Sequence, residues 1–172
     1  MPAGLKPSSS PIQVSAKVTE ILPNTLATET IELNLNPLDN EVFVVTQVNL
    51  DVGVPDSIPG QTTITQASLS TTQRTSVGDI SANNVLAAAK RVIVCNSGMT
   101  ADGGIPFDRE DPTFTSLNES YIGIIATSNC FLNLQSEFNG NVKECNVRIF
   151  GYRASASSSV YAALVQSEVL SA

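Results

Sequence analysis

The sequence predicts an all-β protein, an antiparallel two-sheet sandwich of jelly-roll type with one or two short helices. Several segments alternate apolar and polar residues with the period of two that a half-buried strand requires. Turn-forming residues separate these segments, and no strand–helix–strand alternation indicates a parallel sheet. The segments number about seven to nine, which suits two packed sheets. One domain is expected, because 172 residues are an ordinary domain length.

The first eleven residues differ in composition from the rest of the chain. They contain three prolines and three consecutive serines, and Lys6 is their only charged side chain. Proline removes a backbone donor and cannot continue a helix or a central strand. We therefore expect residues 1–11 to form an extended arm, disordered or laid along another subunit, that serves assembly more than the fold of the subunit.

The sandwich domain is expected over residues 12–153. Alternation places its first strands at 12–19 and 28–35, with a Leu-Pro-Asn-Thr turn between them. Residues 41–52 are rich in β-branched side chains and apolar on both faces at the start, so this strand is expected to be central or covered on both sides. The Thr-rich segment 61–77 predicts one or two exposed strands.

The clearest internal helix signal covers residues 81–90. Ser81 is a favourable N-cap, and the alanines at 87–89 have high helix propensity. The pattern predicts about two helical turns that lead directly into an apolar strand at 91–95. Residues 96–120 are rich in Gly, Pro and Asp and predict the longest irregular stretch of the chain.

A β-hairpin is predicted over residues 129–150. The dipeptide Asn139-Gly140 is the strongest short hairpin signal in the chain, because it favours two-residue turns. Centring the turn there places Leu132 opposite Val147 and aligns the apolar residues of both strands.

The chain ends in a tail, residues 154–172, which is expected to form a short helix or a strand. Serines precede the apolar part and can cap a helix. Two apolar pairs then follow with the i, i+4 spacing of a helix face, namely Val160 with Leu164 and Tyr161 with Val165. A strand is the competing interpretation.

Composition excludes several classes of function. The chain has no His, which removes His-based triads, Cys–His dyads and His–metal hydrolases. Nine Lys and Arg against sixteen Asp and Glu give a net charge of −7, which argues against a nucleic-acid-binding surface. Neither a phosphate-binding glycine loop nor a GxSxG elbow occurs. We therefore predict no enzymatic activity, no catalytic, cofactor-binding or metal-binding residues, and no cofactor.

Two residue groups are candidates for a metal site or a cross-link. Hard cations prefer carboxylates, and one loop clusters four of them: Asp102, Asp108, Glu110 and Asp111. Their spacing matches no EF-hand and Arg109 interrupts them, so a solvated loop is favoured, with cation binding by the Asp102–Asp111 loop left open. The cysteines are odd in number and lack CxxC spacing, which predicts buried, reduced thiols without zinc or disulfide at Cys95, Cys130 and Cys145.

The order of the expected elements carries a resemblance. The strand 29–35 with its Asn-Pro turn, the strand 42–51 ending at a Pro-rich loop, and the closing segment 147–153 with a short tail form one pattern. This pattern resembles the single jelly-roll capsid proteins of tailless icosahedral viruses that infect bacteria or archaea. The resemblance implies a structural virion protein, a subunit of an icosahedral capsid shell that acts through self-association.

Partners and location follow from the same interpretation. The expected partners are copies of the chain in capsomers, and other capsid proteins. The arm lacks a basic cluster, so no direct nucleic acid binding is expected and an internal membrane or inner protein layer would face the genome. The N-terminus lacks the apolar core of a secretory signal, and no apolar run approaches the roughly 20 residues of a membrane-spanning helix. Synthesis in a host cytoplasm and location in the virion are therefore expected.

Two alternatives remain at this point. Within a virion, the protein could be the major capsid protein or a capsid decoration (cement) protein. Outside the shell, it could be a receptor-binding or fibre-tip β domain of a virus or phage, which exposed recognition loops would favour.

Overall fold

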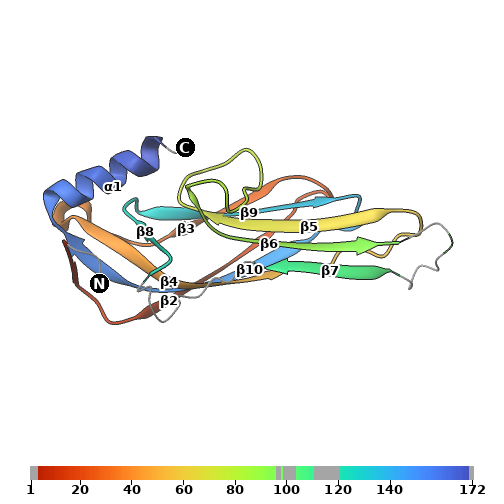
Figure 1. Ribbon diagram of the computed structural model, residues 1–172, viewed down its shortest axis with the longest axis horizontal. Helices are drawn as coiled ribbons and strands as arrows, with labels where there is room; N and C mark the ends of the chain where they lie inside the picture. Colours follow the sequence, from red (N-terminus) through yellow and green to blue (C-terminus); the bar gives the residue numbers. More distant parts are fainter. Residues whose placement is uncertain (1–3, 96–97, 99–103, 111–120, 171–172) are drawn as a thin grey trace.

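The computed structural model describes residues 4–95, 98, 104–110 and 121–170, and these form a two-sheet β-sandwich with α1 at one end (Figure 1). The elements in chain order are β1 (Leu5–Pro7), β2 (Ile12–Thr19), β3 (Ala27–Glu32), the 3-10 turn η1 (Pro37–Asp39), β4 (Glu41–Val52), β5 (Thr62–Ser70), β6 (Val85–Val94), β7 (Ile105–Glu110), β8 (Gly123–Ile125), β9 (Asn129–Glu137), β10 (Glu144–Ala156) and α1 (Ser158–Leu170). The predicted all-β class is confirmed.

The strand order is that of a jelly roll. Sheet A has the order β2-β10-β4-β8, with β1 beside β10 beyond the end of β2, and sheet B has the order β3-β9-β5-β6-β7. Every pairing is antiparallel, and the outgoing strands β2, β3, β4 and β5 pair in turn with the returning strands β10, β9, β8 and β6. The chain is thus a long paired ribbon wound into two sheets, as the jelly-roll prediction requires.

The predicted hairpin over residues 129–150 is wrong. β9 lies in sheet B and β10 in sheet A, so the turn between them crosses from one sheet to the other. Leu132 lies opposite Glu29 and Leu69 instead of Val147. In a jelly roll the last strand pairs with the first, which leaves no partner position for β9 beside β10. The apolar phase was nevertheless correct, because the inward residues of both strands meet in the main core: Cys130, Leu132, Leu134, Cys145, Val147 and Ile149.

The predicted helix at residues 81–90 is also wrong, because most of this segment belongs to strand β6. The alanines 87–89 lie opposite residues 67–69 of β5. Ala87 and Ala89 face the main core, where small side chains fit between the sheets. Tertiary pairing with β5 and β7 therefore outweighs the helix propensity of alanine, which is a weak local preference.

β5 is buried, which corrects the expectation of exposed strands at 61–77. It lies between β9 and β6 in sheet B. Thr63 and Thr65 are fully buried between the sheets. Ser68 and Ser70 are also fully buried, and Ser68 Oγ accepts a hydrogen bond from the Gly78 amide at 3.1 Å. The segment 71–84 folds back over this part of sheet B and covers its outer face.

β4 confirms the expectation of a strand covered on both faces at its start. Phe43 and Val45 are fully buried in the main core between the sheets. Val42 and Val44 project to the opposite face and are fully buried in a second core. A register shift follows near Thr46, whose hydroxyl donates to the Phe150 carbonyl at 3.2 Å. The shift is a β-bulge that returns the later apolar residues of β4 to the main core.

Segments near both ends of the chain pack into the second core. α1 packs on the outer face of sheet A, which confirms the helix interpretation of the tail, and four residues of its predicted face contact the second core: Val160, Tyr161, Leu164 and Val165. From the segment expected as an arm, Leu5 is buried in the same core and Leu5–Pro7 pair with residues 154–156 of β10. Pro7 lies on an edge strand, the position that proline tolerates.

Two glycines provide a matched test of backbone packing. A Cβ on Gly151 would lie 2.3 Å from the Val44 carbonyl oxygen and 2.6 Å from a ring carbon of Phe43. A Cβ on Gly140 would meet only Asp56 Oδ2, at 3.7 Å, and Gly140 does not have a positive φ. Gly151→Ala is expected to lower the free energy of unfolding by about 3 kcal/mol, and Gly140→Ala by less than about 1 kcal/mol. Urea unfolding of both variants measures this, and equal losses would contradict the packing described here.

Candidate interaction surfaces

The structure describes only part of the acidic loop that the sequence offers as a candidate cation site. No three His, Cys, Asp or Glu side chains converge as a metal site among the described residues. Of the acidic loop, Asp102 and Asp111 lie outside the described residues, and Asp108 Oδ1 lies 3.5 Å from Arg91 Nε. In the described part of the chain, no helix is long and apolar enough to span a bilayer.

The cysteine thiols are buried in the sandwich. Burial raises the pKa of both Cys130 and Cys145 to about 12, so these thiols stay protonated at neutral pH. Cys95 is also buried, at the end of the β6 segment. A nucleophile or a zinc ligand requires the thiolate, and burial of this kind therefore favours a packing role.

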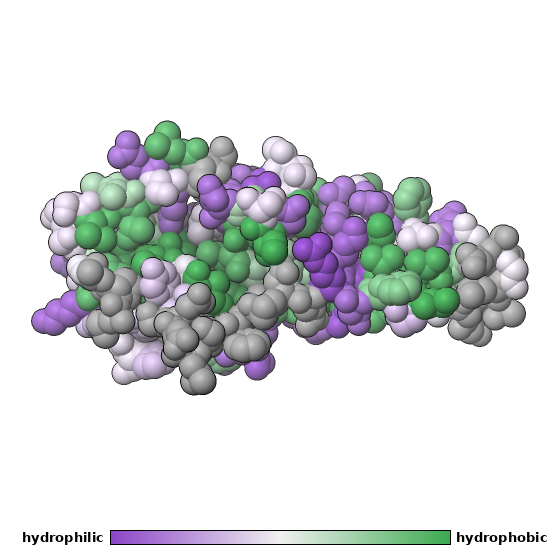
Figure 2. Space-filling view, in the orientation of Figure 1, coloured by the Kyte–Doolittle hydropathy of each residue, from purple (hydrophilic) through white to green (hydrophobic). Residues whose placement is uncertain are grey.

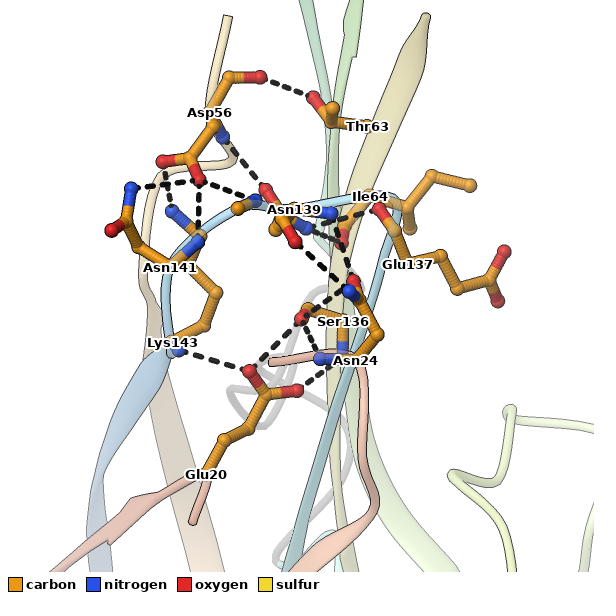
Figure 3. A network of polar contacts seen from close by, with 11 residues as sticks. Glu20, Asn24, Asp56, Thr63, Ile64, Ser136, Glu137, Asn139, Asn141 and Lys143 are labelled. Atoms are coloured by element: carbon orange, nitrogen blue, oxygen red, sulfur yellow. Dashed lines mark hydrogen bonds and ion pairs between the residues drawn. The ribbon is translucent and has the colours of Figure 1, made fainter. Parts of the chain in front are cut away.

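A polar network holds together the loops at the end of the sandwich opposite α1 (Figure 3). Glu20, only 3% exposed, follows β2 directly. Its carboxylate accepts hydrogen bonds from the Ser136 amide at 2.8 Å, the Ser136 hydroxyl at 2.9 Å and the Lys143 amide at 2.9 Å. Asn24 adds a bond from its side chain to the Asn139 carbonyl at 2.9 Å. The β2–β3 loop is thereby tied to the β9–β10 crossing.

Asp56, in the β4–β5 loop, is the second carboxylate of this network. Its side chain accepts from the amides of Gly140 at 2.9 Å and Asn141 at 3.0 Å, and pairs with Lys143 Nζ at 2.5 Å. The Asn139 side chain accepts from the Asp56 amide at 2.7 Å. Asn139 and Gly140 therefore lie in a turn that crosses between the sheets and is stabilised by side-chain hydrogen bonds. Phe138, the residue before them, has a left-handed backbone conformation with φ 58°.

Hydrophobic side chains project from these braced loops into solvent. We call them the apolar loop end, and their exposed fractions run from 45% for Val142 to 90% for Ile21. The members come from three loops: Ile21, Leu22, Val54, Phe138 and Val142. Loops fixed by the buried Glu20 and the half-buried Asp56 present this apolar surface without the entropy cost of ordering it on binding.

The outer face of sheet B carries a second apolar area, the β5–β6–β7 patch. Cross-strand register aligns Ile64, Val92 and Phe107 in one row, and Val94 with Ile105 in the next. Phe107 is 57% exposed and Ile105 48%. Figure 2 shows a hydrophobic area beside a strongly hydrophilic one, toward the end of the visible face where β5, β6 and β7 lie in Figure 1. Contiguous exposed apolar patches mark interaction surfaces on soluble proteins.

The two halves of the outer face of sheet A differ from each other. α1 covers the half that contains the second core. The other half is a shallow polar trough of about 660 Å³, lined mainly by Ser15, Lys17, Asn49, Asp51, Asn146 and Arg148. Two of its side chains contact each other, since Asn146 Nδ2 donates to Asp51 Oδ2 at 3.5 Å. Lys17 Nζ pairs with Glu144, which lies outside the trough lining, at 2.5 Å.

A buried carboxylate fixes the C-terminal half of α1. Glu168, 7% exposed, accepts hydrogen bonds from the amides of Ala126 at 2.8 Å and Thr127 at 3.1 Å. Burial raises the pKa of Glu168, and the bonds from these two residues oppose that shift only in part. The helix is therefore joined to the β8–β9 turn by a group whose protonation affects stability.

Sequence reasoning missed both apolar areas, although a signal was present. Val92 and Val94 alternate with other apolar or charged residues, so the strand has apolar side chains on both faces. Ile105 and Phe107 alternate with Pro106 and Asp108 in a segment interpreted as irregular. The apolar loop end could not be found from local pattern, because three separate loops supply its members.

Comparisons with known proteins found a likeness among solved structures. No protein-family model matches the chain, and no curated protein matches its sequence. A solved structure described as Desmodium yellow mottle tymovirus is similar over 91% of this chain and 91% of its own, with 12% sequence identity and a TM-score of 0.31.

The Asp56–Lys143 pair gives a pH-dependent prediction. Burial would raise the pKa of Asp56, but the bonds from Lys143 and Asn141 outweigh burial and hold the pKa below its ordinary value of 3.8. Asp56→Asn should lower the free energy of unfolding by about 2 kcal/mol at pH 7, because it leaves buried Lys143 without an anionic partner. This stabilisation is fully present above the ordinary pKa and is lost as pH falls through the lower folded value, so the difference from wild type should shrink below pH 3.8. Denaturant unfolding across pH measures it, with exposed Asp51→Asn as the control.

Glu168 predicts the opposite pH dependence. Its folded pKa is raised above the ordinary 4.5, so the unfolded chain loses this proton first as pH rises. Wild-type stability should therefore fall as pH rises from 4.5 through the raised folded pKa. Glu168→Gln removes the titrating group and should remove this part of the decline, whereas exposed Glu29→Gln should retain it. Identical pH profiles for wild type and Glu168→Gln would contradict the role given to the carboxylate.

Proposed function

We propose that this chain is a structural virion protein, a subunit of an icosahedral capsid shell that acts through self-association. The observation that carries the proposal is the pair of exposed apolar areas, the apolar loop end and the β5–β6–β7 patch, on one braced jelly-roll sandwich. Two such areas in different places allow one subunit to contact more than one neighbour, which a closed shell requires.

The fold supports the proposal by analogy. Jelly rolls serve as viral capsid and lectin domains, and a capsid role agrees with the exposed apolar areas described above. The composition favours a shell subunit over a catalyst, because the chain has no His and its buried thiols have a raised pKa. In this proposal the virion is the location and other copies of the chain are the main partners.

Several finer points belong to the same proposal. Lys6 is the only basic residue among the first eleven, so the N-terminal segment is not expected to contact the genome. We expect residues 1–11 to contact neighbouring subunits in addition to adding β1 to sheet A. The same surfaces suit a major capsid protein and a decoration protein, and particle formation by the purified chain separates the two.

One observation favours a second candidate, a receptor-binding or fibre-tip domain. The polar trough on sheet A combines amides, hydroxyls and Arg148, the groups that bind saccharide hydroxyls and carboxylates. Such a domain would bind a glycan array as an isolated oligomer and would form no shell.

Purified protein is expected to form closed particles or curved sheets, visible by negative-stain electron microscopy, when its concentration is raised at neutral pH. Asp56→Asn, which loosens the loops that carry the apolar loop end, should reduce particle yield more than exposed Asp51→Asn does. Particles that appear only when a second virion protein is added would indicate the decoration role. Persistent small oligomers that bind glycans would favour the second candidate and contradict the proposal.

A further inference from the structure

The apolar loop end combines exposed hydrophobic side chains with charges that are turned inward. Three loops at the end of the sandwich opposite α1 carry it, namely residues 20–26, 53–61 and 138–143 (Figure 1). The ionisable side chains of these loops are Glu20, Asp56 and Lys143. Glu20 is 3% exposed, and the side chains of Lys143 and Asp56 are 8% and 23% exposed. All three point into the polar network (Figure 3), so these loops direct hydrophobic side chains, and not charges, toward solvent.

Many backbone groups of the same loops are bonded within the chain. Besides the amides bound by the Glu20 and Asp56 carboxylates, the network accepts from the amides of Asn24 at 3.2 Å, Asp56 at 2.7 Å and Asn139 at 2.8 Å. The Glu20 amide donates to the Lys143 carbonyl at 2.9 Å. Lipid offers no hydrogen-bond partners to a backbone, so a loop that enters it must satisfy its polar groups internally. The network supplies these internal partners.

We infer that the apolar loop end inserts into the surface of a lipid bilayer, with Ile21 and Phe138 among the side chains that enter it. The inference rests on the proposed function and names a further partner, a lipid layer of the same virion. The β5–β6–β7 patch is then left for a neighbouring subunit. A protein partner must match the shape of the loops and pair with their polar groups, whereas lipid surrounds apolar side chains on separate loops without either requirement.

The charges beside the loops select the kind of lipid. Within two residues of the three loops, the sequence places the carboxylates of Asp51, Glu137 and Glu144 and no Lys or Arg. Glu144 pairs with Lys17 at 2.5 Å, which leaves an acidic rim at Asp51 and Glu137. This rim repels anionic headgroups, so the expected bilayer is zwitterionic and the binding is hydrophobic. Binding should therefore not depend on anionic lipid and should not weaken when salt is added.

Tryptophan substitution reports insertion directly, because the chain has no Trp of its own. Phe138→Trp places an indole at the loop end. Leu38→Trp is the control, because Leu38 is 91% exposed in η1 and the neighbouring Asn40 contacts Ser158 at the start of α1. With phosphatidylcholine vesicles, the emission of Phe138→Trp should shift to shorter wavelength and brominated phosphatidylcholine should quench it. Leu38→Trp should show neither effect.

Polar substitution measures the contribution of single side chains to binding. Ile21→Gln and Leu38→Gln form a matched pair, because the wild-type residues are 90% and 91% exposed. Ile21→Gln and Phe138→Asn should each lower the vesicle partition coefficient about tenfold, since each removes an apolar side chain from lipid. Leu38→Gln should leave it unchanged. Asn suits the left-handed backbone at residue 138, where φ is 58°, so Phe138→Asn is expected to fold.

Vesicle sedimentation measures the partition coefficients, and circular dichroism checks that each variant folds. The inference is overturned if Phe138→Trp shows no emission shift at high lipid concentration, or if folded Ile21→Gln and Leu38→Gln bind vesicles equally. Binding that requires anionic lipid and disappears at about 0.5 M salt would also overturn it, because electrostatic attraction would then replace insertion.

Electron microscopy of lipid-free samples separates this inference from the proposed function. Shells formed by a chain that binds no vesicles would overturn the inference and leave the proposed function. Loop-dependent vesicle binding by a chain that never forms shells would do the reverse. If Ile21→Gln and Phe138→Asn prevent association between copies while the wild type binds no vesicles, the loop end contacts a second copy and the inference is overturned.

Discussion

The structure depends on the pairing of β10 with two strands from the first third of the chain. β10 lies between β2 and β4, with β1 continuing the β2 side, so it joins the ends of the sequence in one sheet. Its early residues supply the main core and its late residues Ala154 and Ala156 the second core. Because each outgoing strand pairs with a returning strand, the pairing of β10 with β2 determines which strands can be neighbours in the rest of the fold.

The crossing between β9 and β10 is possible because two carboxylates satisfy its backbone groups. Glu20 accepts from the amides of Ser136 and Lys143, and Asp56 accepts from those of Gly140 and Asn141. Ser136 and Lys143 are buried, and a buried donor without a partner is costly, so the bonds to Glu20 stabilise the crossing most. The same bonds fix three loops relative to one another, so the exposed hydrophobic residues of all three lie at the same end of the sandwich.

The two outer faces of the sandwich differ in a way that suits a building block. Sheet A is covered by α1 on one half and polar on the other, whereas sheet B is covered by residues 71–84 on one half and apolar on the other. On each face, one half is covered by another segment of the same chain, and the other half is exposed and can contact a partner. Contacts of different chemistry on different faces let identical subunits meet in a defined order.

Local pattern in the sequence determined the all-β class, the inward phase of most strands and the double-sided burial of β4, because these follow from periodicity over a few residues. For the tail, local pattern left a helix and a strand as alternatives. Tertiary structure alone decided the rest. The alanines at 87–89 became strand because β5 and β7 offered ladder partners, and Asn139-Gly140 became a sheet crossing because β10 was already paired with β2. The interaction surfaces were hidden for the same reason. Rows such as Ile64, Val92 and Phe107 exist only after distant strands align, and register between distant strands is a property of the whole fold.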